Sequence, residues 1–297
     1  MNTTDVSGLL PPLLASARLP DDPKREPLRV WAHSGVERLH FGDGASVVFK
    51  YADAPFDTEH VALRLAASNG VPVPALRAAR TIPGMLGMLL EDLGEPVRDA
   101  DDHDGARAAV HLHRVAAAAP GMTRLDATAL ASLPPRITSS LQRLGMADLV
   151  ENARALDAAA TGRVSGAELP PFGLCHSEFH PTSLHISASG WRLLDFARAF
   201  IGPGLLDLAS WHGTLDDPQP VRTLGLIESY ITAGGPRQAL AMRGGLDAAS
   251  WALGWHRVWV VNWFTEQIER GWAQEAQDSW TIAIGRHLAE ACTLLKM

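Results

Sequence analysis

The N-terminal third of the chain carries apolar positions at the spacing expected of β-strands. Residues 28–33 and 46–51 are predicted strands, and residues 39–41 form a shorter strand between them. The segment 42–44, Gly-Asp-Gly, stands before the last strand, and such residues accept the positive φ angles of a tight turn. The pattern therefore predicts an antiparallel hairpin that follows a loop over residues 34–38.

A helix and two further strands follow the hairpin. Residues 56–70 carry apolar side chains at helical spacing, and the closing Gly70 marks the end of this helix. Strands are predicted over residues 75–80 and 85–90, after which the composition changes. These elements predict a small β-rich lobe over residues 1–94.

The rest of the chain is mainly helical. From about residue 99 onward strand patterns nearly vanish, apart from one stretch between residues 174 and 196. The predicted helices span residues 106–119, 139–160 (as one or two helices), 205–212, 221–233, 247–270 and 279–295. We therefore predict an α+β fold of two lobes, in which a small antiparallel β lobe with one main helix precedes a larger helical lobe over residues 95–297.

Composition narrows the classes of partner. The chain has 26 Lys and Arg against 33 Asp and Glu, a net charge of −7, so it lacks the basic excess of a nucleic-acid binder. It has no apolar run of the ~20 residues that span a bilayer, and no basic start followed by an apolar signal core. Its two cysteines, Cys175 and Cys292, build neither a disulfide framework nor a thiolate zinc site. We expect a cytoplasmic protein without nucleic-acid or membrane partners, whose oligomeric state the sequence does not indicate.

The densest group of chemically capable side chains lies in the stretch 174–209. Two short apolar strands are joined there by a turn, and a loop with His176, Glu178, His180 and Ser183 precedes one of them. The other strand ends on an acid, Asp195. Such a hairpin brings a general base and a metal-binding carboxylate together around a phosphate, which indicates phosphoryl transfer.

Lys50 and Glu59 form a second candidate pair. Lys50 lies in the last strand of the predicted hairpin, and Glu59 falls in the first turn of the next helix. Glu59 alone would favour the helix dipole, a contribution of only ~0.3–1 kcal/mol. The order of loop, hairpin, lysine strand and glutamate helix favours a pairing in which Glu59 orients Lys50 toward nucleotide phosphates.

Two other interpretations of the loop remain open. His176, Glu178 and His180 alternate along the chain, so on a strand they would share one face and could hold a metal ion in a hydrolase or oxygenase. That interpretation leaves Lys50 and Asp195 unexplained. The loop could also be only a tight connection, with its histidines bonded to the backbone, and we expect this bracing role for His176.

The motifs taken together resemble the aminoglycoside phosphotransferase family. They occur in order over roughly residues 28–215 and comprise Lys50, Glu59, MLLEDLGE, HLHR with His113, HSEFHPTS, LLDFA and GPGLLDLA. That family has a protein-kinase-like fold and includes enzymes that inactivate antibiotics and kinases for small metabolites. Within it, the chain looks most similar to actinomycete self-resistance phosphotransferases of the kind acting on capuramycin, viomycin or capreomycin.

The resemblance implies a reaction and a set of site residues. The reaction is the Mg²⁺-dependent transfer of the γ-phosphoryl group of ATP or GTP to a hydroxyl of a small molecule. The acceptor is an antibiotic of nucleoside, peptide or aminoglycoside type, whose modification confers resistance. The alternative acceptor is a small metabolite. The implied nucleotide-binding residues are Ser34, Gly35 and Val36 above the phosphates, Lys50 with Glu59, and the backbone of Glu91 and Leu93 at the purine. Asp195 takes the place of the metal-binding aspartate.

Two positions depart from the family pattern. Glu178 stands where the family has an aspartate as catalytic base, and Ser183 where it has a metal-binding asparagine. The extra methylene of glutamate moves the carboxylate, and a hydroxyl is a weaker ligand than an amide oxygen. His176 and His180 complete the implied catalytic loop. The departures also keep open a kinase-like nucleotide-binding protein with impaired transfer.

Tryptophans recur at every fourth position of the predicted helix 247–270, which places them along one face. Core packing is their simplest role, because large aromatic side chains dominate buried area. A row of indoles would also suit a flat, sugar-bearing or nucleoside-like acceptor, and no compelling acidic cluster accompanies it for a polycation. The candidate acceptor contacts on this helix are Trp255, His256, Trp259 and Asn262.

Overall fold

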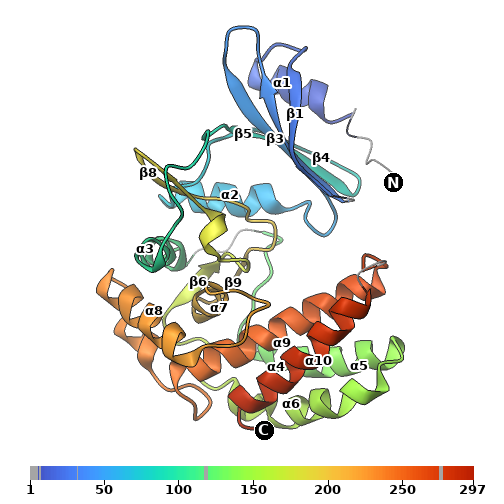
Figure 1. The fold of residues 1–297 in the computed structure, drawn as a ribbon, viewed down its shortest axis with the longest axis vertical. Coiled ribbons are helices and arrows are strands. Elements are labelled where there is room, and N and C mark those ends of the chain that lie inside the picture. The colour runs from blue at the N-terminus through green and yellow to red at the C-terminus, as the bar shows by residue number, and fades with distance from the viewer. Residues whose placement is uncertain (1–5, 7, 32, 117–119, 274–276) are drawn as a thin grey trace. The chain divides into compact units, whose positions relative to one another are not determined.

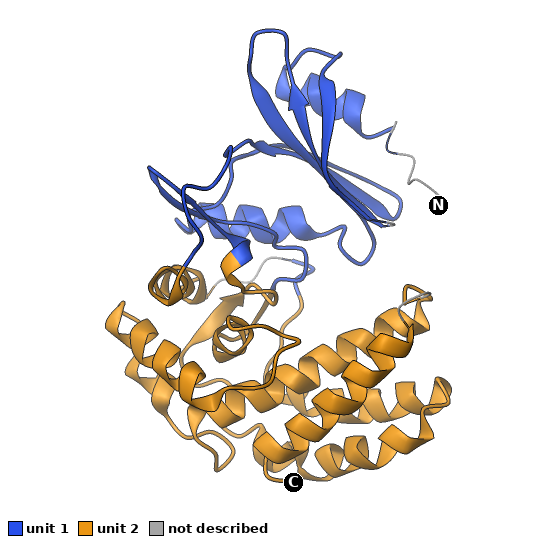
Figure 2. Ribbon diagram, viewed as in Figure 1, with its two compact units in different colours: residues 1–100, 117–122, 182–199 blue, residues 101–116, 123–181, 200–297 orange. Residues whose placement is uncertain are grey.

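The computed structural model describes residues 6, 8–31, 33–116, 120–273 and 277–297 (Figure 1). The chain divides into two compact units (Figure 2). Unit 1 comprises residues 1–100, 117–122 and 182–199, and unit 2 comprises residues 101–116, 123–181 and 200–297. The units therefore do not follow a single cut in the chain, because residues 182–199 return to the first of them.

Unit 1 contains a five-stranded antiparallel sheet in the order β1-β2-β3-β5-β4. Its strands are β1 (Lys24–Val30), β2 (Ser34–His40), β3 (Ser46–Asp53), β4 (Leu76–Ile82) and β5 (Met85–Glu91). Two helices accompany the sheet, α1 (Leu10–Ala17) and α2 (Glu59–Ser68). The predicted turn over residues 42–44, the predicted helix and the two later strands are confirmed, whereas no helix was predicted at α1.

The two faces of this sheet differ because α1 covers one of them. Leu13 of α1 and Phe49 of β3 belong to one hydrophobic cluster on that face. A methyl group added at Gly87 of β5 would meet Leu13 at 3.0 Å, so the helix lies directly on the strand. Lys50 is paired in register with Val36 and Met88 in the neighbouring strands, and these three residues share the opposite face.

The predicted loop over residues 34–38 is wrong, because these residues form most of β2. Its polar residues concealed the alternation, in which Gly35, Glu37 and Leu39 are buried and the positions between them are half-buried. Glu37 tolerates burial because Arg25 of β1 donates to its carboxylate at 2.6 and 2.8 Å. Gly35 is required there, since any Cβ would collide with the Tyr51 ring. Ser34, Gly35 and Val36 are therefore strand residues, not loop residues.

A separate hairpin completes unit 1. Its strands are β7 (Leu184–Ser187) and β8 (Gly190–Leu193), as the sequence predicts for the two strands on either side of a turn. Val97 donates its N–H to the carbonyl of Ile186 at 2.8 Å, and Leu193 donates to the carbonyl of Pro72 at 2.9 Å. These backbone bonds attach the hairpin to unit 1 although it lies far along the chain.

Unit 2 is mainly helical, and its described residues include a small two-stranded sheet. The sheet pairs β6 (Phe172–Cys175) with β9 (Phe200–Pro203). Strand β9 was not predicted, because it is short and ends in Gly202 and Pro203, residue types that favour loops. The helices are α3 (Asp102–His113), α4 (Ala127–Ala131), α5 (Leu133–Arg143), α6 (Val150–Arg163), α7 (Leu205–Ser210), α8 (Pro220–Thr232), α9 (Ala248–Glu269) and α10 (Gln277–Leu294). Short 3₁₀ turns occupy Ala147–Leu149, Pro181–Ser183 and Arg237–Leu240.

The helix prediction is confirmed for most of this unit. The helix predicted over residues 106–119 begins earlier, at Asp102 under a capping box with Asp101, and ends at His113, while residues 117–119 lie outside the described part. Helix α9 is buried along nearly its whole length, so residues on several of its faces lie in the core and not only the face that carries the tryptophans. Within the described residues, no helix combines the length and apolar character needed to cross a bilayer.

Candidate active site

Lys50 and Glu59 form a buried ion pair within unit 1. The Lys50 Nζ lies 2.8 Å from Glu59 Oε1 and 2.7 Å from Oε2. The Glu59 side chain is only 2% exposed, so its charge depends on this partner. The strand β3 presents the lysine, and the first turn of α2 presents the glutamate, as the order of elements predicts.

Asp195 contacts the same lysine. Its Oδ1 accepts a hydrogen bond from Lys50 Nζ at 2.7 Å, and its side chain is 46% exposed. The backbone of Asp195 has φ of 63°, a left-handed conformation that a non-glycine residue adopts only under constraint. The next residue supplies part of this constraint, because the Phe196 N–H donates to Glu59 Oε1 at 3.1 Å.

Lys50 therefore contacts two carboxylates, those of Glu59 and Asp195. Burial by itself would lower the pKa of Lys50, but the charges of Glu59 and Asp195 and their hydrogen bonds raise it above its ordinary value. Lys50 stays protonated at neutral pH as a consequence. A permanent cation beside an exposed carboxylate is the arrangement that binds a polyphosphate together with a metal ion.

The hairpin register brings the two predicted metal ligands together. Leu184 pairs with Leu193, so Ser183 and Leu194 are the next residues outward on the two arms. The Leu194 N–H donates to the Ser183 carbonyl at 2.8 Å, and Asp195 follows directly. Carboxylate and hydroxyl oxygens are hard donors that suit Mg²⁺, which keeps water or phosphate in its remaining positions. The residues present fit that ion.

The loop that holds Glu178 lies in unit 2 and is anchored by Asp207. This aspartate stands in the first turn of α7 and is fully buried. It accepts from the backbone N–H groups of His176 at 2.8 Å and of Ser177 at 2.9 Å. Asp207 therefore supports the loop. Its carboxylate binds the N–H groups of a loop 30 residues earlier in the chain, although it lies in the first turn of its own helix.

Phe179, the residue after Glu178, is also fixed by contacts with the rest of unit 2. Ser210 donates its hydroxyl to the Phe179 carbonyl at 2.9 Å. The Phe179 ring is fully buried against Trp211, with ring centroids 5.0 Å apart, and also meets the His176 ring at 6.2 Å. Glu178 itself is half-buried, so the loop fixes the neighbours of one carboxylate that retains exposed surface.

The two loop histidines differ in their surroundings. His176 is fully buried, in keeping with the bracing role expected of it, and His180 is half-buried. The alternative metal cluster of His176, Glu178 and His180 is not formed among the described residues. The physical reason is that these residues belong to an irregular loop, in which Ser177 has φ of 75°, and not to a strand that would align alternate side chains.

A different group of three side chains of metal-binding types does lie close together in the described part of the chain. Its members are His113, Cys175 and Asp207. Burial raises the pKa of the Cys175 thiol well above its usual value, which disfavours the thiolate that a metal requires. The thiol lies 3.4 Å from the Gly202 carbonyl, and Asp207 already accepts the two loop N–H groups. Cys175 and Asp207 of this cluster therefore already have hydrogen-bond partners within the protein.

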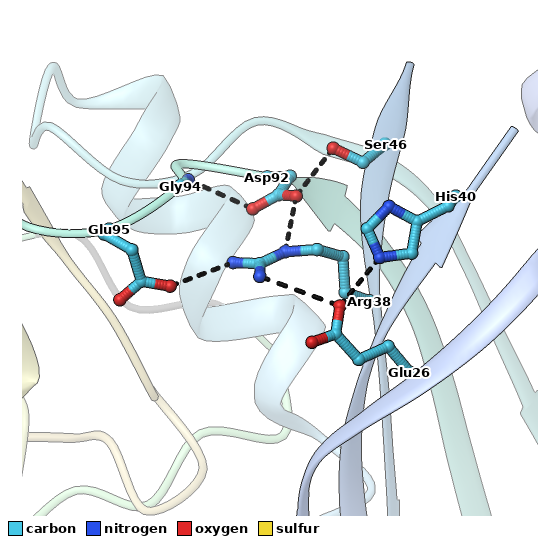
Figure 3. Close-up of polar contacts among 7 residues, drawn as sticks. All are labelled: Glu26, Arg38, His40, Ser46, Asp92, Gly94 and Glu95. Carbon is cyan, nitrogen blue, oxygen red and sulfur yellow. Dashed lines mark hydrogen bonds and ion pairs between the residues drawn. The ribbon is translucent and has the colours of Figure 1, made fainter. Parts of the chain in front are cut away.

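The predicted purine contacts, the backbone of Glu91 and Leu93, flank an acid that sequence reasoning missed. Asp92 accepts from Arg38 Nε at 2.8 Å, from the Ser46 hydroxyl at 2.7 Å and from the Gly94 N–H at 3.0 Å (Figure 3). These hydrogen bonds outweigh burial and lower the pKa of Asp92 below its usual value. They tie the segment that follows β5 to strands β2 and β3.

Further ion pairs surround this network. Glu26 of β1 lies 2.7 Å from the His40 ring and 3.9 Å from Arg38, and Glu95 lies 3.6 Å from Arg38 (Figure 3). No local motif distinguishes Arg38 or Asp92 from other surface charges. Only the register of β2 against β3, which pairs Arg38 with Val48, brings the arginine to the face of the sheet that carries Lys50.

The candidate acceptor residues on α9 have unequal access to solvent. Trp255 and His256 are each 1% exposed, and Asn262 is 6% exposed with its amide bonded to Glu266. The Trp255 indole N–H donates to the Arg163 carbonyl at 3.2 Å. These three side chains lie in the core of unit 2 as packing would place them. Trp259 is half-buried, and its indole N–H donates to Ser177 Oγ at 3.1 Å.

Comparison with known proteins agrees with this architecture. The model of the phosphotransferase enzyme family matches residues 38–241 of the chain. A search of curated proteins gave no match. Several hundred chains of solved structures are similar, so the α+β fold, with an antiparallel N-terminal sheet and a larger helical lobe as in protein kinases, is confirmed.

Three of these structures illustrate the similarity. A type I macrolide 2′-phosphotransferase has a TM-score of 0.64 at 14% identity, with 95% of this chain and 97% of that chain covered. A macrolide 2′-phosphotransferase from Brachybacterium faecium has a TM-score of 0.60 at 18% identity, with 95% and 98% covered. A choline/ethanolamine kinase family protein from Mesorhizobium loti has a TM-score of 0.58 at 17% identity, with 99% and 100% covered.

Proposed function

The chain belongs to the phosphotransferase enzyme family, and from this we propose that it transfers the γ-phosphoryl group of ATP or GTP to a hydroxyl of a small-molecule antibiotic. The observation that carries the proposal is the position of Lys50, which Glu59 and Asp195 hold between two carboxylates at 2.7 to 2.8 Å. A lysine held by a helix glutamate, with an aspartate at the end of a hairpin, is the constellation that binds nucleotide phosphates in kinase-like enzymes.

The transfer assigns a role to each group. The acceptor oxygen bonds to the γ-phosphorus, the bond to the β-phosphate oxygen breaks, and nucleoside diphosphate leaves. Glu178 takes up or orients the proton of the acceptor hydroxyl. Asp195 and Ser183 would hold Mg²⁺, which supplies neutralisation of the charge that develops on the phosphate oxygens. His176 would brace the loop, and His180 would either brace it as well or contact the acceptor.

The nucleotide would lie against the sheet face that carries Lys50. Val36 shares this face, whereas Gly35 faces Tyr51 on the other side, so the backbone and the Val36 side chain are the parts of this strand that would meet the nucleotide. The backbone groups of Glu91 and Leu93 would meet the purine edge, with Asp92 holding that segment in place.

Two classes of acceptor are supported by the known proteins. The macrolide phosphotransferases named above modify antibiotics according to their names, which supports an antibiotic as the class of acceptor. The choline/ethanolamine kinase family protein is covered along its entire length, which supports a small metabolite as the second candidate. A sequence identity below 20% indicates a shared fold and does not identify the acceptor, which an experiment has to determine.

An acceptor screen tests the proposal. Purified protein is incubated with Mg·ATP or Mg·GTP and a panel of aminoglycosides, macrolides, capuramycin, viomycin, capreomycin, choline and simple sugars, and products are measured by mass. A gain of one phosphoryl group on one compound supports the proposal and identifies the acceptor. Tight nucleotide binding with no product from any compound favours the kinase-like binding protein, and absence of nucleotide binding overturns both.

A further inference from the structure

Trp259 and Ser177 are joined by a hydrogen bond that links helix α9 to the loop of Glu178. The Trp259 indole N–H donates to Ser177 Oγ at 3.1 Å, across 82 residues of sequence. Ser177 is 7% exposed, so this hydroxyl is largely shielded from water. The two residues belong to unit 2 and come together through its tertiary packing.

Ser177 is an unusual residue to stand at this place. Its φ of 75° lies in the left-handed region, which serine adopts at an energetic disadvantage and glycine adopts freely. A strained conformation persists only when its surroundings fix it in several places. Here the backbone N–H is held by Asp207 at 2.9 Å and the side chain by Trp259.

The strain lies directly before Glu178. Rotation about the backbone of residue 177 would swing the next carboxylate, and a misplacement of ~1 Å can reduce a rate by about 10²-fold. The bond from Trp259 is the side-chain contact that opposes this rotation. Its donor comes from the helix of the candidate acceptor residues, so the same helix would control the direction of Glu178.

We propose that Trp259 is a positioning residue, whose indole N–H holds Ser177 in its left-handed conformation and thereby aims the carboxylate of Glu178. This inference rests on the proposed function, since it assigns Trp259 a part in the same reaction. The ring of Trp259 has a second, separate role, because it packs against Phe200 with centroids 5.1 Å apart.

The two roles of Trp259 can be separated by substitution. Trp259→Phe keeps an aromatic ring against Phe200 and removes the N–H donor. Ser177→Gly removes the hydroxyl and relieves the strain, so it should preserve thermal stability while it frees the loop. Ser177→Asn is the conservative variant, because asparagine accepts a hydrogen bond through its amide oxygen and tolerates positive φ.

A double-mutant cycle on turnover tests the proposal, with transfer to the identified acceptor as the reaction, or hydrolysis of Mg·ATP where water is the acceptor. We expect Trp259→Phe and Ser177→Gly each to lower kcat about tenfold, with the KM for nucleotide within about twofold of wild type. The double variant should be no slower than the slower single variant, since both remove one bond. Ser177→Asn should recover most of the kcat that Ser177→Gly loses.

The outcomes separate this inference from the function on which it depends. An active wild type with unchanged kcat in Trp259→Phe, or with fully additive losses in the double variant, would overturn the inference alone. A wild type inactive in transfer and hydrolysis would overturn the proposed function and the inference with it. Hydrogen exchange of the Trp259 indole N–H, assigned by its absence in Trp259→Phe, should accelerate in Ser177→Gly, and unchanged exchange would also count against the bond.

Discussion

His113 Nε2 lies 3.2 Å from Asp207 Oδ2, and both side chains are completely buried. The same carboxylate accepts from two backbone N–H groups of the loop that carries Glu178. One aspartate therefore joins α3, α7 and the loop through its contacts with His113 and with two backbone N–H groups. Removing that charge should affect the folding of unit 2 and the position of the loop together.

Asp207→Asn should destabilise the protein by about 2–4 kcal/mol, because an amide cannot accept from both loop N–H groups and the histidine as a carboxylate does. Urea unfolding followed by tryptophan fluorescence measures the change. Asp157→Asn, at an exposed position of α6, is the matched control and should be nearly neutral. Equal stabilities for the two variants would contradict a structural role for the carboxylate.

Lys50→Met should destabilise unit 1 by about 3 kcal/mol, since it leaves the buried carboxylate of Glu59 without a cation. The added substitution Glu59→Gln removes that charge, so the double variant should regain a large part of the lost free energy of unfolding. Thermal and urea unfolding of the two variants give the comparison. A double variant less stable than Lys50→Met would show that the unpaired Glu59 carboxylate is not the cause of the destabilisation. Both variants should lose nucleotide turnover.

Glu178→Gln should lower kcat by about 10²-fold or more, while the Kd for nucleotide stays within a few-fold of wild type, because a neutral amide cannot take up a proton. Glu178→Asp keeps the charge and retracts it by one methylene, so a smaller loss of about tenfold is expected. Steady-state kinetics and calorimetric nucleotide binding separate the two quantities. Near-normal turnover in Glu178→Gln would exclude this residue as the base.

Asp92→Ala should raise the KM for nucleotide about tenfold with little change in kcat, because the segment beside Glu91 and Leu93 loses its attachment to Arg38 and Ser46. Glu95→Gln is the control, since its carboxylate is 86% exposed and lies 3.6 Å from Arg38. An unchanged KM in Asp92→Ala would show that the network does not position this segment.

His287 should make stability depend on pH. Burial and the nearby charge of Arg257 lower the pKa of His287 from 6.5 to about 4, although Glu290 acts in the opposite direction. Between these values the unfolded chain binds a proton that the folded chain does not, so stability rises with pH over this range and falls as the pH drops from about 6.5 toward 4. The full difference corresponds to about 3 kcal/mol.

Unfolding of wild type and His287→Phe at pH 7 and pH 4.5 isolates this contribution. The difference in free energy of unfolding between the two proteins should shift by about 2–3 kcal/mol in favour of the variant at the lower pH. His103→Gln, at an exposed position, should show no such shift. Parallel pH profiles for wild type and His287→Phe would contradict the assignment.

The elements that could be predicted are those whose signals are local. The turn over residues 42–44 requires positive φ, the helix with Glu59 shows its period within ten residues, and the arms of the hairpin before Asp195 are adjacent in the chain. Once these elements form, β3 and α2 bring Lys50 to Glu59 within nine residues of sequence. Fold class and the ion pair at Lys50 therefore follow from short-range patterns and spacing.

The strand β2 shows why other elements were missed. Its buried Glu37 looks like a solvent-facing residue until Arg25 of β1 is placed beside it, and the demand for glycine at Gly35 arises only from the Tyr51 ring. A sequence read locally treats such residues as loop, because charge and glycine favour loops on average. Pairing across strands reverses that preference.

Local patterns in the chain are enough for the order of strands and helices, for the family resemblance, and for the residue types at the candidate site. Three contacts are decided by the tertiary structure alone. Asp207 holds the backbone of the loop that carries Glu178, and the Trp259 indole N–H bonds to Ser177. Asp92 anchors the segment after β5. The physical reason is distance along the chain. These contacts join groups up to 82 residues apart, and a hydrogen bond depends on separations of a few tenths of an ångström that no spacing in the sequence encodes.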